Sequence, residues 1–245
     1  MIFKDLLNTE LASQLDGDTT GLGIQDTLKY LSSRFQGEIA FSTSFGQEDQ
    51  VITDMIFTAD LPILVFTLDT GRHFEETYKL MNQTLAKYSK KIKVCFPDKD
   101  QVEKLMTQKG PFSFYESVEN RKECCYIRKV EPMQKILSQT SCWITGIRSG
   151  QSEGRHSLQR ISYDESNQVI KYNPLIDWSI DQVKEYLKLN HVPYNVLHDR
   201  GFPSIGCAPC TRAVAEGEDL RAGRWWWENN SSKECGLHQN EQKGQ

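Results

Sequence analysis

Helical and strand-like patterns alternate along most of the chain, and this alternation constrains the fold more than any other feature of the sequence. Apolar runs typical of buried strands occupy residues 38–45, 61–71, 91–96 and 141–148. Helical spacing of apolar residues or an N-terminal capping box predicts helices at residues 24–35, 46–57, 72–88, after 98 and at 180–190. Strands separated by helices imply right-handed parallel crossovers. We therefore expect an α/β protein with a parallel sheet flanked by helices.

The sequence divides by pattern into three consecutive parts. We expect residues 1–36 to form an N-terminal helical segment without a recognisable motif, and residues 37–200 to form the α/β body. From residue 201 the periodicity fails, and residues 201–245 are rich in glycine, polar residues and tryptophan. We expect an irregular C-terminal segment that folds over the body and is anchored by packing of the tryptophans at 225–227.

Charge and hydropathy exclude several classes of protein. The net charge is -4 and the mean hydropathy is -0.56, and no apolar run approaches the length of a membrane span. The acidic, amphipathic start does not fit a secretion signal, so we expect a cytoplasmic protein. Neither a membrane nor a nucleic acid is expected as a partner, whereas a homo-oligomer stays an option.

Four of the seven cysteines form two pairs that could together ligate a metal centre. Cys124 and Cys125 are adjacent, and Cys207 and Cys210 form a CxxC motif. Four thiolates are the usual ligands of a [4Fe-4S] cluster and also of a structural zinc ion. Zinc sites usually take both pairs from spaced motifs such as CxxC. We therefore expect a [4Fe-4S] cluster, with zinc and unligated cysteines as the alternatives.

The remaining cysteines differ in their surroundings. Cys95 and Cys142 lie inside apolar strand-like runs, where a small core side chain is the expected role. Cys235 lies in a KECGLH stretch, beside Lys233 and three residues before His238. Because cationic and hydrogen-bonding neighbours can lower the pKa of a thiol, Cys235 is either a reactive cysteine or an incidental one.

Two small polar loops follow predicted strands, at the sheet edge where open parallel sheets bind ligands. The first loop offers hydroxyls, a glycine and backbone N–H groups at a helix start, as phosphate-binding loops do. The first loop contains Ser42, Ser44, Gly46 and Gln47, and the second contains Asp69, Thr70 and Gly71. Both are also typical of ordinary turns, because they lack the lysine of a P-loop and the spacing of GxGxxG.

Basic residues gather in loops of this acidic chain. Arginine binds sulfate and phosphate groups bidentately, so such clusters suggest a ligand that carries one of these groups. Solvated surface charges are the alternative. The residues concerned are Arg128, Lys129, Arg148, Arg155, Arg221 and Arg224.

Several longer motifs lie between about residues 40 and 238. They are SFGQEDQV, LDTGRHFEETY, GPFSFYE, ECCYIRK, WITGIRSGQSEGR, PYNVLHDRGFPSIGCAPCTR, GRWWWE and KECGLH. With these motifs the chain resembles the iron-sulfur-containing assimilatory adenylyl-sulfate (APS) reductases. The related phosphoadenylyl-sulfate (PAPS) reductases share the loops and the ECGLH tail but lack both cysteine pairs. The four paired cysteines therefore place the sequence with the APS type.

This resemblance implies an adenine nucleotide α-hydrolase-like fold, a [4Fe-4S] cluster on the paired cysteines and a thiol mechanism. Cys235 would attack the sulfur of APS, expel AMP and become an S-sulfocysteine. An external thiol, from reduced thioredoxin or glutaredoxin, would then release sulfite. The implied role is in assimilatory sulfate reduction and cysteine biosynthesis.

The resemblance also implies roles for the polar and basic loops. Lys129, Arg221 and Arg224 match positions that hold the sulfate and phosphate groups, and Arg155 matches the arginine of a QSxxR motif near Arg148. Here that motif is QSEGR, which is shorter and more acidic than the QSPGTR common in this type. The loop at 42–47 would hold the phosphate, and the loop at 69–71 would lie near the nucleoside.

Other functions stay open from the sequence. A four-cysteine reductase could also accept PAPS, because one basic residue could bind the additional phosphate. An ATP-pyrophosphatase-type adenylating enzyme would share the fold, although the loop at 42–47 lacks the second glycine of an SGGxDS-type loop. In a non-enzymatic, zinc-stabilised module Cys235 would have no role.

The end of the sequence leads to one expectation about the electron donor. Some relatives carry a thioredoxin-like domain after the ECGLH tail, whereas this sequence ends seven residues after His238. The CxxC motif is assigned to the cluster and cannot also act as a dithiol. We therefore expect that Cys235 depends on a thiol from another molecule.

Overall fold

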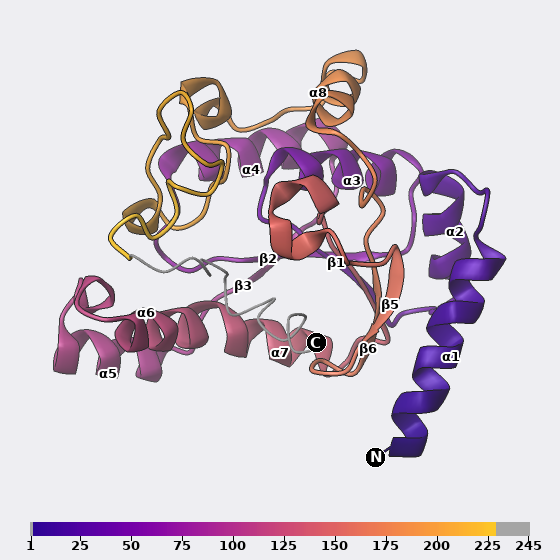
Figure 1. Cartoon of the computed structure of the whole chain (residues 1–245), viewed down its shortest axis with the longest axis horizontal. Coiled ribbons are helices and arrows are strands. Elements are labelled where there is room, and N and C mark those ends of the chain that lie inside the picture. The colour runs from indigo at the N-terminus through magenta and orange to yellow at the C-terminus, as the bar shows by residue number, and fades with distance from the viewer. Residues whose placement is uncertain (1, 229–245) are drawn as a thin grey trace. The chain divides into compact units, whose positions relative to one another are not determined.

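The structure is a computed structural model that describes residues 2–228 (Figure 1). Its α-helices are α1 (Ile2–Asp18), α2 (Ile24–Arg34), α3 (Gln47–Thr58), α4 (Glu75–Tyr88), α5 (Lys99–Lys109), α6 (Val118–Cys125), α7 (Glu131–Leu137) and α8 (Ile180–Leu189). A π-helical segment, η2, covers Tyr126–Val130. The short 3-10 helices are η1 (Ser113–Tyr115), η3 (Ser149–Gln151), η4 (Glu153–Arg155), η5 (Val196–Arg200) and η6 (Ala208–Cys210). None of the helices within residues 2–228 has the length and apolar character needed to cross a membrane.

The strands form one six-stranded, mostly parallel sheet in the order β3-β2-β1-β4-β6-β5. The strands are β1 (Ile39–Ser42), β2 (Leu64–Leu68), β3 (Lys93–Cys95), β4 (Cys142–Ile144), β5 (Ile161–Asp164) and β6 (Val169–Tyr172). β1 pairs in parallel with β2 and β4, and β4 pairs in parallel with β6. The prediction of a parallel sheet flanked by helices is thus confirmed, with one addition, because β5 pairs antiparallel with β6 at the edge.

Two helix starts follow the capping chemistry that the sequence indicates. The Asp98 carboxylate accepts a hydrogen bond from the backbone N–H of Gln101, at 3.1 Å, where α5 begins. Ser179 and Gln182 form a reciprocal capping box at the start of α8, with N···O distances of 3.2 and 2.8 Å. Each cap satisfies backbone donors that the first helical turn leaves unpaired, and so fixes where the helix begins.

By contact density the structure divides into two compact units. The first unit comprises the chain up to Thr67, Leu80–Lys93 and Leu137–Tyr194. The second comprises Leu68–Lys79, Val94–Ile136 and the chain from Asn195 onward. Each unit is assembled from segments that are distant in sequence, whereas sequence pattern divides the chain into three consecutive parts.

The first unit contains the main apolar core. The interior side chains of β1 and β4, such as Phe41 and Ile144, are fully buried and pack with Ile52 of α3. Helix α3 packs against α8 and α2, and α1 packs against β5. Continuous apolar runs in β1 and β4 are what a parallel strand covered on both faces requires. This core holds the loops that follow β1 and β4.

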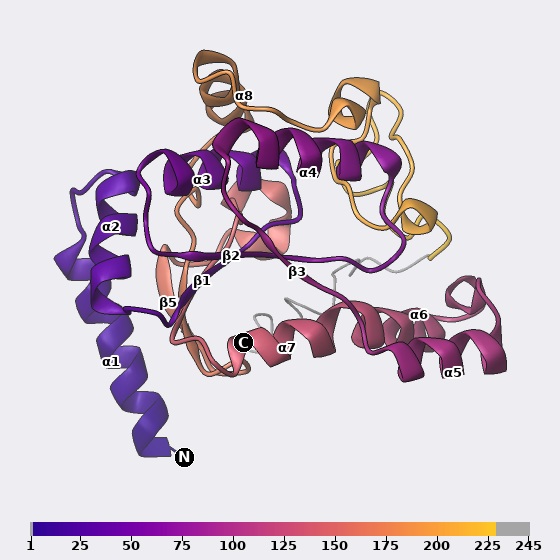
Figure 2. The same ribbon diagram turned by 180° about the vertical axis from the view of Figure 1, so that it is seen from behind.

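The second unit has a smaller core between helices and irregular chain. Leu105 of α5 packs with Phe114, Cys124 and Ile127, and Trp227 packs against this cluster. Helices α5 and α6 lie side by side, and α7 follows α6 through the π-helical segment (Figure 2). Both cysteine pairs predicted as ligands belong to this unit.

Candidate active site

In the first unit, the loop after β1 is held by a carboxylate from the helix that follows it. The backbone N–H and the hydroxyl of Ser44 both donate to Asp49 Oδ2, at 2.6 and 2.7 Å. Gly46 caps α3, and Gln47 is its first residue, so N–H groups are presented at the helix start. Phe45 has φ = 61°, a left-handed conformation that is uncommon outside glycine and often found at ligand sites.

Asp49 is a site residue that sequence reasoning did not single out. Burial raises the pKa of Asp49 to about 6, against the hydrogen bonds from Ser44 that favour the carboxylate. The backbone of the TGIR stretch after β4 approaches it so closely that a Cβ on Gly146 would lie 2.0 Å from Asp49 Oδ1. The SFGQED motif contained this residue, but its burial depends on the distant glycine.

Arg148, also in the first unit, forms an ion pair with Glu48. Arg148 Nε donates to Glu48 Oε1 at 2.8 Å, and both side chains are largely buried. Gln151 donates to the same carboxylate at 3.0 Å and accepts a hydrogen bond from Arg155 Nη1. The charge of Arg148 is therefore balanced inside the protein, whereas Arg155 is connected to this network through a neutral amide. The Ser42 hydroxyl accepts from the Trp143 indole at 2.9 Å.

In the second unit, the loop that begins at Asp69 is an Asx turn. The N–H of Gly71 donates to Asp69 Oδ1 at 2.8 Å, and the Tyr78 hydroxyl donates to the same oxygen at 2.9 Å. The Asp69 N–H donates to the carbonyl of Cys95 at 2.9 Å. Local side-chain bonds of this kind fix a tight turn and its exposed backbone groups.

The next residue of this loop, Thr70, connects the two cysteine pairs. Its hydroxyl lies 3.3 Å from Cys207 Sγ. Its carbonyl accepts a hydrogen bond from Arg128 Nη1 at 2.6 Å, and the Arg128 guanidinium favours the thiolate form of Cys124. Thr70 thus contacts both Cys207 and the guanidinium that neighbours Cys124.

The CAPC loop is fixed by contacts with two other predicted motifs. The Ala208 N–H donates to the carbonyl of Arg72 at 2.8 Å. The Tyr115 hydroxyl, from the GPFSFYE stretch, donates to the carbonyl of Pro209 at 2.6 Å. Cys210 packs against the apolar cluster that contains Cys124. The resemblance placed these motifs in one family, and the structure shows that they also contact one another.

A change of helix type occurs directly after the adjacent cysteines. Helix α6 ends at Cys125, and the π-helical segment that follows carries Arg128 and Lys129. π-Helical turns are rare and are frequently found at functional sites. The wider turn changes the direction of the side chains that follow it. Arg128 is consequently buried, and the positive charge of Lys129 favours the thiolate forms of Cys207 and Cys210.

Besides burial, the charge of Cys207 contributes to the raised pKa values of Cys124 and Cys210, and the charge of Cys125 contributes to that of Cys210. Burial opposes the Cys207 thiolate, but Lys129, the Thr70 hydroxyl and Arg224 together lower the pKa of Cys207 below its ordinary value. Burial, followed by the charges of Cys207 and Cys125, raises the pKa of Cys210 to about 12. Burial likewise raises the pKa of Cys124. A metal centre that binds all four cysteines as thiolates must therefore stabilise them with the positive charge of its metal ions.

The residues around the paired cysteines fit an anionic iron-sulfur cluster. The nitrogens Arg128 Nε, Arg224 Nε and Trp227 Nε1 are buried without a hydrogen-bond partner in the described part of the chain. Each nitrogen belongs to a residue that either packs against a predicted cysteine ligand or lowers its pKa. Buried donors without acceptors are costly, and cluster sulfurs would provide acceptors. Within residues 2–228, no three His, Cys, Asp or Glu side chains converge as a metal-binding group.

Arg224 is buried and lies close to the CAPC loop. Its Nη1 donates to the Ser204 hydroxyl at 3.2 Å, and its guanidinium lies 4.7 Å from the ring centre of Trp225. A Cβ on Gly206 would lie 2.4 Å from Arg224 Nη2, so the guanidinium passes directly over that glycine. No carboxylate within residues 2–228 pairs with Arg224. A buried cation of this kind suits an anionic ligand.

Other predicted residues lie in different surroundings. Arg221 belongs to the irregular segment, where its N–H donates to Asp219 at 2.8 Å. Cys142 is fully buried in β4, and Cys95 is partly buried in β3. Cys235, the predicted nucleophile, lies outside the described residues.

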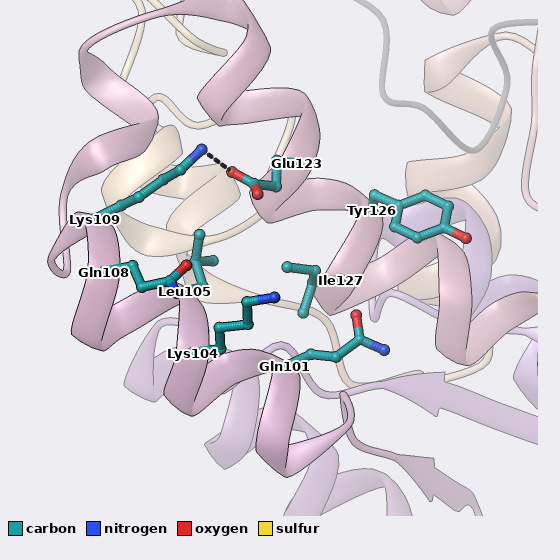
Figure 3. A pocket seen from close by; sticks show the side chains of 8 residues that line it. All are labelled: Gln101, Lys104, Leu105, Gln108, Lys109, Glu123, Tyr126 and Ile127. Atoms are coloured by element: carbon teal, nitrogen blue, oxygen red, sulfur yellow. Dashed lines mark hydrogen bonds and ion pairs between the residues drawn. The ribbon is translucent and has the colours of Figure 1, made fainter.

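A pocket of about 390 Å³ in the second unit contains none of the predicted site residues. It lies over α5 and α6, where Lys109 Nζ is 2.7 Å from Glu123 Oε2 (Figure 3). Leu105 and Ile127 line the pocket and also belong to the apolar cluster around Cys124.

Comparison with known proteins identifies close relatives over most of the chain. The adenosine 5'-phosphosulfate reductase of Agrobacterium fabrum is 45% identical over 226 residues, which cover 92% of this chain and 86% of the relative. The adenosine 5'-phosphosulfate reductase of Neisseria meningitidis serogroup B is 46% identical over 226 residues, which cover 91% of this chain and 92% of the relative.

Solved structures share the fold. The phosphate complex of phosphoadenylyl-sulfate reductase from Candida auris is 30% identical, with a TM-score of 0.70, covering 84% of this chain and 97% of that one. The FMN adenylyltransferase of Candida glabrata is similar in fold alone, at 18% identity and a TM-score of 0.52, over 94% of this chain and 85% of that one. The predicted adenine nucleotide α-hydrolase-like fold is confirmed.

The chain also matches a known domain family. The phosphoadenosine phosphosulfate reductase domain matches residues 38–213, which is well over half of the sequence. The predicted resemblance is confirmed by this match together with the relatives named above. The chain belongs to the phosphoadenosine phosphosulfate reductase domain family.

Proposed function

We propose that this protein reduces APS to sulfite and AMP with electrons from an external thiol. The observation that carries the proposal is the network in the second unit, which connects both cysteine pairs and places Lys129 and Arg224 beside them. Relatives at 45% and 46% identity are named adenosine 5'-phosphosulfate reductases, which supports APS as the substrate. The reaction would serve assimilatory sulfate reduction and cysteine biosynthesis in the cytoplasm.

The reaction proceeds in three steps, in which a sulfonate group is transferred to Cys235, sulfite is released, and a disulfide is reduced. The Cys235 thiolate attacks the sulfur of APS, a sulfur–sulfur bond forms, and AMP departs with the electron pair of the broken sulfur–oxygen bond. A thiolate of the donor then attacks the Cys235 sulfur and expels sulfite, which leaves a mixed disulfide. A second donor thiol reduces this disulfide and restores Cys235. Two electrons pass from the dithiol to sulfur, and the donor leaves as a disulfide.

Cations are needed because each reacting group is anionic. A thiolate that approaches a sulfate is repelled, and AMP leaves with additional negative charge on its phosphate. Arg224 is suited to bind one of these groups, since it is buried without a carboxylate partner in the described chain. Lys129 lies close enough to Cys207 to lower the pKa of that thiol, so its charge extends over the same region. Arg155 and Arg221 are the further cations assigned to the substrate.

The loop after β1 would bind the phosphate of the nucleotide. The N–H groups at the start of α3 are suited to an anion, and Gly46 leaves space for it to approach the backbone. Asp49 holds Ser44 in place and thereby fixes the loop. The loop from Asp69 to Gly71 would lie near the nucleoside, while Thr70 also contacts Cys207.

A [4Fe-4S] cluster would be held by Cys124, Cys125, Cys207 and Cys210. When bound, the cluster would supply a compact anionic centre that orients nearby cations and tunes the local potential. Around it, Arg128 holds the Thr70 carbonyl, and Trp227 closes the apolar side. The two electrons of the proposed reaction come from the thiol donor alone.

PAPS is the second candidate substrate. The Candida auris relative, at 30% identity, is named a phosphoadenylyl-sulfate reductase and has the same fold over 84% of this chain. One basic residue could bind the extra phosphate, so both nucleotides belong in the test. The higher identity to the relatives named for APS favours APS.

Protein purified without air tests the cluster and the reaction together. We expect about four iron and about four sulfide ions per chain, lost when Cys207 is replaced by Ser. With APS alone, one equivalent of AMP should form and Cys235 should gain the mass of a sulfonate. Reduced thioredoxin or glutaredoxin should then release sulfite and allow turnover, whereas Cys95→Ser should behave as wild type. Stoichiometric zinc without sulfide, or turnover without a thiol, would contradict the proposal.

A further inference from the structure

The second unit exposes a cluster of large apolar side chains. This aromatic patch consists of Met106, Phe112, Tyr115 and Trp226, whose exposed fractions are 37%, 59%, 38% and 38%. The rings of Phe112 and Tyr115 stack with centroids 6.2 Å apart, and the rings of Tyr115 and Trp226 meet edge to face at 6.1 Å. Such clusters on soluble proteins mark interaction surfaces, whereas single exposed apolar residues do not.

Contacts with Trp227 and Arg72 hold the side chains of the patch in place. Trp227 contacts both Tyr115 and Trp226, with ring centroids 4.4 and 4.9 Å apart. Arg72 Nη2 donates to the Pro111 carbonyl at 2.7 Å and lies 3.5 Å from Met106 Sδ. Aromatic anchors that are already held in place lose little conformational entropy on binding, which is typical of binding hot spots.

The composition of the sequence after the patch favours a partner from another molecule. Residues 229–245 read NNSSKECGLHQNEQKGQ, and Leu237 is their only aliphatic or aromatic residue. A segment of this composition offers little apolar surface to four large apolar side chains. A partner protein with an apolar surface fits the patch better.

The position of the patch in the sequence identifies the partner class. Trp226 precedes Cys235 by nine residues, and a chain of that length spans at most about 30 Å. Under the proposed function, a donor thiol must reach the sulfur of Cys235, so the donor must bind within that distance. The Tyr115 hydroxyl also donates to the CAPC loop, at Pro209, so the patch is part of the unit that carries the cysteine pairs.

We propose that the aromatic patch is the docking surface for the dithiol protein that reduces S-sulfonated Cys235. This inference rests on the proposed function and adds the partner's binding site to it. The patch binds the apolar surface that surrounds the donor's reactive thiol. A small-molecule thiol needs no such surface, and this difference makes the proposal testable.

The test compares a protein donor with a small one on the full-length protein. We expect Trp226→Ser, and more strongly Phe112→Ser combined with it, to raise the KM for reduced thioredoxin at least tenfold. Turnover driven by dithiothreitol and the initial release of AMP should stay within twofold of wild type. Phe96→Ser is the matched control, because Phe96 is 64% exposed in the same unit but outside the patch. That variant should match wild type with both donors.

A binding measurement separates docking from turnover. Labelled thioredoxin with its cysteines replaced by serine should bind the wild type more tightly than the patch variants, by fluorescence anisotropy. Equal binding and equal KM values would overturn the inference, and so would a parallel loss of activity with both donors. A wild-type dimer that the patch variants convert to monomer would assign the surface to self-association instead. If APS is not converted with either donor, the proposed function fails, whatever the anisotropy shows.

Discussion

Replacement of Arg121 by Met should destabilise the second unit strongly, because it leaves a buried carboxylate without a partner. Arg121 Nε and Nη2 donate to the two carboxylate oxygens of Glu228, at 2.5 and 3.1 Å. The side chains are only 3% and 5% exposed. The guanidinium also lies 4.7 Å from the ring centre of Trp225. Glu228 thereby fixes the chain seven residues before Cys235.

The expected magnitude follows from the burial of both charges. Breaking a buried ion pair by removing one partner costs about 3–5 kcal/mol, whereas replacing both partners by apolar side chains is close to neutral. With a urea dependence of about 3 kcal/mol per molar, Arg121→Met should lower the unfolding midpoint by about 1–1.7 M. The double variant Arg121→Met with Glu228→Met should regain most of that loss, because Met is unbranched and packs adaptably.

Urea unfolding followed by far-UV circular dichroism measures these differences. The control is Lys109→Met, which removes an ion pair with Glu123 whose side chains are 40% and 42% exposed. Exposed pairs contribute less than about 1 kcal/mol, so this midpoint should move by less than about 0.3 M. A midpoint for Arg121→Met equal to that of the control would refute the reasoning. A double variant less stable than either single variant would refute it as well.

Four other variants test the site. Asp49 has a pKa of about 6 when folded, above its ordinary 3.8, so the folded state binds the extra proton and stability falls as pH rises from 4 to 6. Between pH 4 and pH 7 the free energy of unfolding of Asp49→Asn should therefore rise by roughly 2.5 kcal/mol relative to wild type, as measured by urea unfolding. A difference between the two proteins that does not change with pH would contradict this. Arg224→Met should raise the KM for APS at least tenfold with little loss of stability, whereas Arg148→Met should lower the urea midpoint, because it leaves Glu48 buried and unpaired. Cys235→Ser should bind APS in equilibrium dialysis but form no sulfite, because a hydroxyl is a far weaker nucleophile than a thiolate.

The sheet was predictable from the sequence except at one edge. Strands β1, β2 and β4 are continuous apolar runs, and these predicted their burial. Strands β5 and β6 have four residues each and contain Asp164 and Lys171, which suggest a polar loop. Lys171 is nevertheless 1% exposed, with its ammonium 5.1 Å from the Trp143 ring centre. A pattern of polar and apolar residues cannot reveal a lysine buried by a ring 28 positions away.

The residues of the site were predictable by type, but their partners were not. The loops and cysteine pairs carry recognisable chemistry, so sequence alone singled them out. Arg148 and Arg224 look alike in sequence, yet one is paired with Glu48 and the other has no carboxylate partner within residues 2–228. Thr70 was expected near the nucleoside, and its hydroxyl lies against Cys207, 137 positions away. Only the fold determines which of two similar residues keeps its charge available for a ligand.

Under the proposed function, the local geometry of the adjacent cysteines favours a polynuclear cluster over a single zinc ion. In a tetrahedral zinc site with bonds of about 2.3 Å, two ligand sulfurs lie about 3.8 Å apart. Successive helical residues diverge by about 100°, so Cys124 and Cys125 at the end of α6 point in different directions. Accordingly, Cys124 is buried and its thiolate is favoured by Arg128, whereas Cys125 is partly exposed and its charge adds, after burial and Cys207, to the raised pKa of Cys210. Two diverging thiols suit separate corners of a polynuclear cluster better than one small ion, and the unpartnered donors of Arg128, Arg224 and Trp227 favour the same centre.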